Sequence, residues 1–222
     1  MFKKAKELCR QYSALTIMAV YAVIYMAIFY YLENREVAHY VIHFGIDAYI
    51  PFCKYFIVPY IMWFGYVAIT VCWLCIKDKE EGKRLVSFLI VGMTIFLFIS
   101  AIFPNGLNLR PKILEGDDIF IRMIKGLYAA DTSTNVIPSI HVYNSIAVMI
   151  AVCRTQLLKK HNVIKLLMLL LGALIICSTV LIKQHSMLDV MVAFILSGLA
   201  YTIFYRNNEG TVSVGAEAKY KY

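Results

Sequence analysis

Charged residues are scarce in this sequence. Only 16% of its 222 residues are charged and 61% are hydrophobic, whereas soluble domains carry about 25% charged and roughly 45–50% apolar residues. The apolar residues are gathered in long runs, each near the roughly 20 residues that a helix needs to cross a bilayer. A soluble fold would expose several of these runs to water, so the composition excludes it.

The runs also lack the alternation of apolar and polar residues that marks the strands of a membrane barrel. We therefore predict an all-α membrane protein with six transmembrane helices, at residues 14–32, 55–76, 86–103, 136–153, 163–182 and 187–205. The first run has no small-residue cleavage site after it, so we interpret it as an uncleaved span. Residues 1–206 then form one membrane domain, and the polar segment 207–222 is predicted to be a disordered tail.

Basic residues are unevenly distributed between the segments that join these runs. With a cytoplasmic N-terminus, 15 of the 22 Lys and Arg residues fall on the cytoplasmic side. Cytoplasmic loops carry an excess of Lys and Arg, so we expect both termini in the cytoplasm and a multi-pass protein of the cell membrane. The net charge of +8 follows from this topology and from attraction to anionic membrane lipids, so no nucleic-acid partner is expected. The oligomeric state is left open.

A disulfide framework and a metal cage are both absent from the pattern. Six cysteines lie in or beside the apolar runs. The Cys72–Cys75 pair has no second pair and no histidine nearby, which favours apolar packing over metal binding. We expect no metal and no cofactor. Internal repeats, which many transporters show, are also missing.

Two clusters of polar residues open the fourth and sixth runs, and under this topology both face the non-cytoplasmic side. The first is Pro138-Ser139-Ile140-His141, where Asn135 or Thr134 is expected to cap a helix that starts with Pro138. The second runs from Lys183 to Asp189, and His185 and Asp189 are four residues apart, on one helix face. Ionisable groups at membrane depth are costly, so they predict a functional site.

These residue types suit phosphoryl transfer. A histidine is a nucleophile when a carboxylate fixes its tautomer, and a second histidine can serve as general acid and base. Cationic side chains and helix N-termini stabilise the charge of the transferred group. The long loop 104–135 precedes the fourth run, and within it residues 119–128 have the spacing of a short interfacial helix.

Three ordered motifs now resemble those of the type 2 phosphatidic acid phosphatase superfamily: Arg110-Pro111, Pro138-Ser139-Ile140-His141, and Ser178-x6-His185-x3-Asp189. The family patterns are Lys-x6-Arg-Pro, Pro-Ser-Gly-His and Ser-Arg-x5-His-x3-Asp, with all the motifs here lying within residues 104–190. The resemblance implies a six-span fold and metal-independent chemistry on a lipid phosphate. More distant members include sphingomyelin and inositol phosphorylceramide synthases.

The resemblance also implies roles for individual residues. His185 would be the nucleophile, Asp189 would orient it, and His141 would be the general acid and then the base. Arg110, Ser139 and Lys183 are the expected phosphate ligands, although Lys183 matches no family position. The sequence departs from the family where Phe103 replaces Lys, Ile140 replaces Gly and Thr179 replaces Arg.

The sequence leaves several functions open. The leading one is a lipid phosphate phosphatase that hydrolyses a phosphomonoester or pyrophosphate lipid. The same histidines would serve a phosphotransferase that passes a phospho-headgroup to an alcohol. A transporter with a His–Asp proton relay and an inactive lipid-binding relative are the remaining alternatives.

Overall fold

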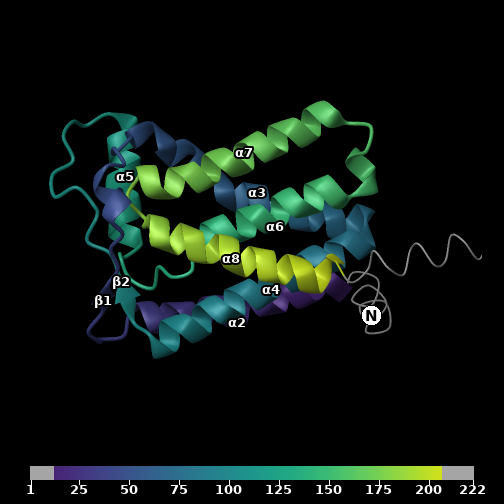
Figure 1. The fold of residues 1–222 in the computed structure, drawn as a ribbon, viewed down its shortest axis with the longest axis horizontal. Coiled ribbons are helices and arrows are strands. Elements are labelled where there is room, and N and C mark those ends of the chain that lie inside the picture. The colour runs from purple at the N-terminus through teal and green to yellow at the C-terminus, as the bar shows by residue number, and fades with distance from the viewer. Residues whose placement is uncertain (1–12, 207–222) are drawn as a thin grey trace, which may run out of the picture.

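The computed structural model describes residues 13–206 and is mostly helical. Six helices run along the long axis of the molecule (Figure 1): α2 (Ser13–Glu33), α3 (Ile57–Lys77), α4 (Lys79–Ile102), α6 (Ile140–Arg154), α7 (Asn162–Leu181) and α8 (Met187–Phe204). The predicted tail 207–222 lies outside the described residues, as does the basic segment before Ser13.

Five of these helices are long and apolar enough to cross a membrane: α2, α3 extended back to Lys54, α4, α7 and α8. The sixth predicted span corresponds to α6, a shorter apolar helix of 15 residues. At 1.5 Å per residue it is about 22 Å long, less than the roughly 30 Å of a hydrocarbon core. Figure 1 shows α6 between its neighbours, and Val142, Tyr143 and Val148 on it are fully buried.

Two predicted helix starts are wrong, each because a cap residue decides the boundary. Helix α4 begins at Lys79, not near residue 86, because Asp78 ends α3 and accepts a hydrogen bond from the Glu81 N–H at 3.2 Å. The charged residues expected in a connection are therefore the first turns of α4. Helix α6 begins after Ser139, whose hydroxyl accepts from Val142 N–H at 3.4 Å. Neither Thr134 nor Asn135 caps it.

Close approach of backbones joins α4 to its neighbours. A Cβ at Gly82 would lie 2.7 Å from the backbone of Cys75, so the α3–α4 hairpin requires glycine there. A Cβ at Gly92 would lie 1.9 Å from the ring of Tyr143, whose hydroxyl donates to the Phe88 carbonyl at 2.9 Å. Tyr143 thus occupies the groove on α4 and fixes α6 against it.

One end of the bundle, here called the loop end, carries the irregular segments. They are the 3-10 turns η1 (Gly45–Ala48) and η2 (Lys54–Phe56), the two-residue parallel strands β1 (Tyr40–Val41) and β2 (Asn105–Gly106), and α5 (Ile119–Ala130). Helix α5 confirms the expected short helix in the long loop, and it lies across the ends of the long helices (Figure 1). Asp118 caps α5 and pairs with Lys54 at 2.5 Å, and Tyr128 donates to the Ile182 carbonyl at 2.6 Å.

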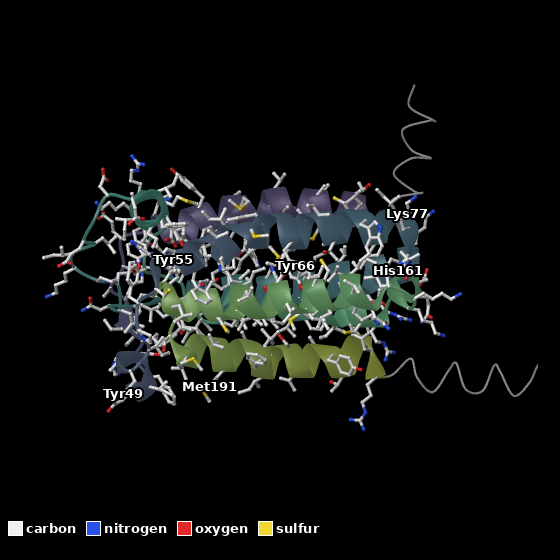
Figure 2. All side chains as sticks on the ribbon, turned by 90° about the horizontal axis from the view of Figure 1, so that it is seen from above. Tyr49, Tyr55, Tyr66, Lys77, His161 and Met191 are labelled. Carbon is white, nitrogen blue, oxygen red and sulfur yellow. The ribbon has the colours of Figure 1, made fainter. Side chains whose placement is uncertain are left out.

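The opposite end, here called the hairpin end, holds the α3–α4 turn, η3 (Gln156–Leu158) between α6 and α7, and the end of α8. Figure 2 places Lys77 and His161 at this end and Tyr49 and Tyr55 at the loop end, with Tyr66 between them. The first residues of α6 and α8 lie at the loop end, so the two predicted catalytic histidines are brought to the same end of the molecule.

Candidate active site

The start of α8 positions His185 through Asp189. Ser186 caps α8, and its N–H donates to Asp189 Oδ2 at 2.9 Å, which completes a capping box. The same Oδ2 lies 3.2 Å from His185 Nδ1. Because Nδ1 is engaged by the carboxylate, the other ring nitrogen, Nε2, is the one left for a reacting atom. The predicted contact between His185 and Asp189 is therefore formed, but the expectation that they share a helix face is wrong, because Ser186 caps α8 and His185 lies in the turn before it.

A second carboxylate, Asp47 in η1, binds the start of α8 from the loop between α2 and α3. Asp47 is 2% exposed; its Oδ2 accepts from the Ser186 hydroxyl at 2.6 Å and its Oδ1 from the Met187 N–H at 2.8 Å. It thereby binds donors of the first turn of α8, which have no partner within the helix. Asp47 ties the loop after α2 to the first turn of α8, which directly follows His185.

His141, in the first turn of α6, faces His185 across a short gap. The two ring centroids are 5.8 Å apart. The imidazole of His141 is held by two aromatic residues of α3: Tyr60 stacks on it at 4.5 Å, and Trp63 is tilted against it at 4.2 Å between centroids. Its Nε2 is buried and has no hydrogen-bond partner within the described chain. Packing, not a hydrogen bond at Nε2, therefore fixes the ring.

Both histidines line one cavity of about 330 Å³. Its wall among the long helices α2, α3 and α4 is aromatic and apolar, and it is formed by Tyr25, Met26, Phe29, Tyr60, Trp63, Phe64 and Phe96. Its wall at the loop end is polar and includes Asp131, Thr132, Thr134, Asn135 and Gln184. The cavity is therefore amphipathic, with the histidines on its polar side.

Arg110 lies at the loop end but is held by other parts of the protein. Its Nη1 donates to the Tyr128 carbonyl at 3.2 Å, and its Nη2 donates to the Thr132 carbonyl at 2.9 Å and to Gln184 Oε1 at 2.5 Å. The guanidinium also lies 4.3 Å from the centroid of the Tyr128 ring. Burial lowers the pKa of Arg110 from its ordinary value, and the charge of Asp131 opposes that shift.

The other two expected phosphate ligands also have contacts of their own. Ser139 is fully buried as the cap of α6, and its N–H donates to the Asp189 carbonyl at 3.3 Å, which joins α6 to α8. Lys183 donates from Nζ to the backbone carbonyls of Asp47, at 3.1 Å, and Ile50. Lys183 thus holds the loop of η1 in place, and its role as a phosphate ligand stays a prediction.

Two acidic residues, Asp131 after α5 and Glu33 at the end of α2, lie at the polar wall of the cavity or directly behind it. Asp131 lines the cavity, and burial raises the pKa of its carboxyl, with a further rise from the nearby charge of Glu33. Glu33, at the end of α2, accepts hydrogen bonds from the Thr132 hydroxyl and from Asn135 Nδ2, the latter at 2.9 Å. The polar wall is therefore built from amides, hydroxyls and a carboxyl group. Among the described residues that line it, none is Lys or Arg.

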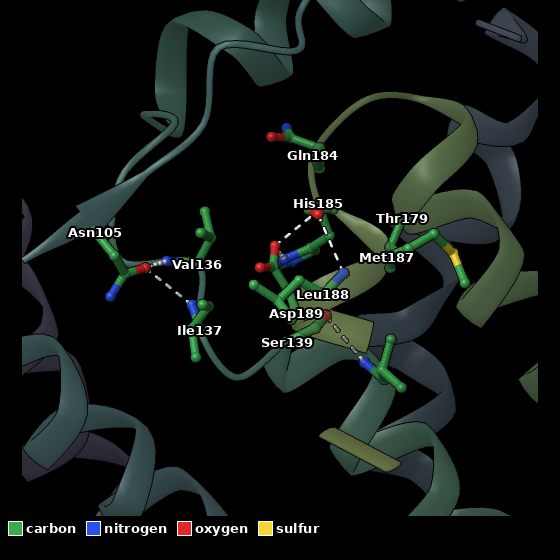
Figure 3. Close-up of polar contacts among 12 residues, drawn as sticks. Asn105, Val136, Ile137, Ser139, Thr179, Gln184, His185, Met187, Leu188 and Asp189 are labelled. Carbon is green, nitrogen blue, oxygen red and sulfur yellow. Dashed lines mark hydrogen bonds and ion pairs between the residues drawn. The ribbon is translucent and has the colours of Figure 1, made fainter. Parts of the chain in front are cut away.

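Several residues of this site carried no assigned role in the sequence. Asp47 lies far from the histidines along the chain, and Gln184, although adjacent to His185, matches no position of the motifs. Tyr60 and Trp63 are three residues apart on an apolar helix, a pattern that packing alone explains. Asn105 was also missed; its Oδ1 accepts from the N–H groups of Val136, at 2.8 Å, and Ile137, at 3.0 Å, and so shapes the approach to α6 (Figure 3).

The arrangement has the parts of a two-step group transfer. A histidine oriented by a carboxylate provides a nucleophile, and a second histidine on the same cavity can protonate a leaving oxygen. No group of three or more His, Cys, Asp or Glu residues that could hold a metal ion occurs in residues 13–206. The candidate reactive groups of this site are the two histidines, with polar residues around them.

Comparison with known proteins agrees with the motifs. The family model of the PAP2 superfamily matches residues 85–211, which contain both histidines, Asp189 and Arg110. No match was found among curated proteins or among solved structures. The matched range is more than half of the chain, and we conclude that the chain belongs to the PAP2 superfamily.

Proposed function

We propose that this protein is an integral membrane lipid phosphate phosphatase that acts through a phosphohistidine on His185. The observation that carries this proposal is the facing pair of histidines in one cavity, with rings 5.8 Å apart and Asp189 bound to Nδ1 of His185. Membership of the PAP2 superfamily supports phosphoester chemistry over a proton-relay transporter.

The proposed reaction has two steps. In the first, Nε2 of His185 attacks phosphorus, the bond from phosphorus to the lipid oxygen breaks, and protonated His141 gives its proton to that oxygen. In the second, His141 takes a proton from water as the water oxygen attacks phosphorus, which breaks the N–P bond and releases phosphate. Asp189 holds the tautomer of His185 and stabilises the charge on its ring throughout.

The cavity supports a lipid as the substrate. Its aromatic and apolar wall between α2, α3 and α4 can bury acyl methylene groups, each worth about 0.8 kcal/mol. A small soluble phosphate ester would leave this wall in contact with water. The phosphate is expected at the polar wall, where Gln184 and the histidines lie.

The distribution of basic residues supports a location of this site on the non-cytoplasmic face. The hairpin end carries Lys77, Lys79, Lys83 and Arg84 in and beside the α3–α4 turn and Arg154, Lys159, Lys160 and Lys165 around η3. The positive-inside rule would place that end in the cytoplasm and the loop end opposite. In this proposal α6 serves as the sixth, shortened span.

The test is phosphate release by the intact protein in detergent with added lipid. Phosphatidate, phosphatidylglycerophosphate, sphingosine phosphate and isoprenyl pyrophosphate are assayed with a chelator present. We expect chelator-resistant release that is lost in His185→Ala and kept in His161→Ala, a matched control at the hairpin end. Equal release by wild type and His185→Ala would remove His185 as the nucleophile.

A second candidate, a phosphotransferase with a phosphodiester donor, is favoured by the charges that line the cavity. Within the described chain that lining holds Asp131 and neither Lys nor Arg, and a singly charged diester is easier to accept there than a doubly charged monoester. Transfer of a labelled headgroup from a phospholipid to an alcohol, without phosphate release, would establish this alternative. No turnover with either donor would indicate an inactive lipid-binding relative.

A further inference from the structure

Gln184 occupies the turn between α7 and α8, immediately before His185. Its backbone N–H and that of His185 both donate to the Thr179 carbonyl, each at 3.0 Å, so the turn is fixed against the last residues of α7. The side chain of Gln184 is 4% exposed and lines the cavity with His141 and His185. Figure 3 shows Gln184 and His185 on the same stretch of chain, with His185 beside Asp189.

The orientation of this amide is set by Arg110. A guanidinium group only donates hydrogen bonds, so the atom of Gln184 that meets Arg110 Nη2 at 2.5 Å must be the acceptor, Oε1. The amide nitrogen, Nε2, must then point away from Arg110. It is buried and has no partner in the part of the chain that the structure describes.

A buried amide donor without a partner destabilises the empty site, so a ligand that accepts its hydrogen bond removes that cost. The ligand atom has to be an acceptor, and the cavity is where the two histidines would handle a phosphoryl group. Arg110 itself is not among the residues that line the cavity. Its Nη1 and Nη2 groups donate to Tyr128, Thr132 and Gln184. Its remaining nitrogen, Nε, is buried without a partner among the described residues.

We propose that Gln184 is a substrate-binding residue: its Nε2–H group donates to a non-bridging oxygen of the phosphoryl group that reacts at His185, while Arg110 acts through it as a positioning residue. This inference rests on the proposed function in placing the phosphoryl group at His185. It assigns Gln184 the task of a cation that this sequence lacks at Phe103 and Thr179.

The positive charge of Arg110 can act on the phosphoryl group through the amide of Gln184. Hydrogen bonds in a chain polarise one another, so the guanidinium strengthens the Gln184 donor without leaving its own carbonyl partners. The resulting donor is neutral and fixed in direction, as a group that stabilises a transition state needs to be. The site thereby binds an anion without exposing Arg110 to the cavity.

Orthovanadate, an analogue of the phosphoryl group, is the probe, and its binding to purified protein is measured directly, independently of turnover. Gln184→Met removes the amide, and we expect vanadate affinity to fall about tenfold or more.

Gln184→Glu places a carboxylate against Arg110, so the melting temperature is maintained while vanadate affinity falls about a hundredfold. The exposed Gln156 of η3 provides the matched control, Gln156→Glu, which leaves affinity unchanged. Wild-type affinity in a folded Gln184→Glu variant would overturn the inference.

A double-mutant cycle tests the positioning role. Arg110→Lys should weaken vanadate binding in the wild type but add less than about threefold in the Gln184→Met background, because residues that act in series are not additive. Independent, multiplicative losses would show that Arg110 reaches the phosphoryl group itself and would overturn its assignment as a positioning residue. The outcome for the proposed function is separate: chelator-resistant turnover lost in His185→Ala supports the phosphohistidine whether or not Gln184 contributes.

Discussion

The two ends of the bundle each bury a carboxylate on a helix, and the two carboxylates have different surroundings. At the hairpin end, Glu81 is 4% exposed; its Oε1 accepts from the Tyr205 hydroxyl at 2.7 Å, and its Oε2 lies 3.5 Å from Arg84. At the loop end, Asp189 is fully buried; its Oδ2 has two partners, and its Oδ1 has none within residues 13–206.

The same difference extends to the residues around them. At the hairpin end, Asp78 caps α4 and accepts from the Thr155 hydroxyl at 2.7 Å, which joins α4 to η3. At the loop end, the buried atoms without a partner in the described chain include Trp63 Nε1, Asn135 Oδ1, His141 Nε2 and Gln184 Nε2, whose residues line the cavity. Arg110 Nε and Asp189 Oδ1 are also without a partner there, and their residues bind Gln184 and His185. Buried polar groups in folded proteins are nearly always paired. The buried carboxylate of the hairpin end therefore has its partners within the protein, whereas buried atoms around the cavity are available to bind a ligand.

Asp189→Asn should have the largest effect on turnover. It replaces the carboxylate that contacts His185 by an amide of the same shape. An amide in place of the carboxylate no longer holds His185 in the reactive tautomer, and we expect turnover to fall about 10³- to 10⁴-fold. The measurement is single-turnover phosphate release. Glu81→Gln, the same chemical change at the hairpin end, should leave turnover per folded molecule unchanged, and equal losses in both would contradict the distinction.

His141→Ala should cost about 10²- to 10⁴-fold in turnover of a lipid with an alkoxide leaving group, since it removes the general acid. The loss should be smaller for a nitrophenyl ester in the first step, because a nitrophenolate departs without a proton. Rapid-quench measurement of the phosphohistidine separates that step from hydrolysis. A deficit that is the same for both leaving groups would argue against His141 as the acid.

Tyr205→Phe tests the hairpin end by stability instead of activity. Removing the hydroxyl leaves Glu81 Oε1 buried without its donor, which should lower the free energy of unfolding by about 1–3 kcal/mol. Turnover per folded molecule should be kept. Thermal unfolding in detergent measures the first expectation, and a large loss of turnover without loss of stability would refute the assignment of this end as structural.

Asp131→Asn should have the smallest effect. It should raise stability at neutral pH, whereas Tyr205→Phe lowers it. Burial raises the pKa of the Asp131 carboxyl in the folded protein above its value in the unfolded chain. Its contribution to stability is therefore present below the unfolded pKa and is lost as pH rises through the folded pKa. At neutral pH the ionised group is a cost, so the amide should raise the melting temperature, and this gain should vanish in acid.

Asp118→Asn is the control for that last variant. In the folded protein the hydrogen bond from Lys54 lowers the pKa of Asp118, and Asp118 also caps α5. The carboxylate therefore stabilises the fold above the unfolded pKa, and the amide should lower the melting temperature at neutral pH. Melting curves from about pH 4 to 8 distinguish the two aspartates, and shifts of the same sign would contradict the burial argument.

The long helices could be predicted because each is a continuous apolar run. The expected boundaries of α2, α7 and α8 differ from the observed ones by one residue, since the runs stop where polar residues begin. The boundaries of α4 and α6 could not be read in this way. Charged residues such as Glu80 and Lys83 extend α4 beyond its apolar run, and Ser139 delays α6 by using its side chain as the cap.

The contact between His185 and Asp189 could also be predicted, because the two residues are only four positions apart along the chain. The predicted helix face was wrong, since the helix begins after His185. Arg110 and Ser139 were expected as phosphate ligands from the motifs and Lys183 from its charge, and neither a motif nor a charge reveals what a side chain already binds. Arg110 and Lys183 donate to backbone carbonyls of loops whose paths no local pattern specifies.

By itself, the sequence determined that this is a helical membrane protein of the PAP2 superfamily, and which residues form its His–Asp pair. The helices follow from the cost of exposing apolar runs to water, the family from ordered motifs, and the pair from residues four positions apart. Only the tertiary structure decided which groups face the cavity. The stacking of Tyr60 on His141, the support of α8 by Asp47 and the orientation of Gln184 by Arg110 join residues from distant segments. Such contacts depend on how the helices pack, because their donors and acceptors meet only after the bundle has formed.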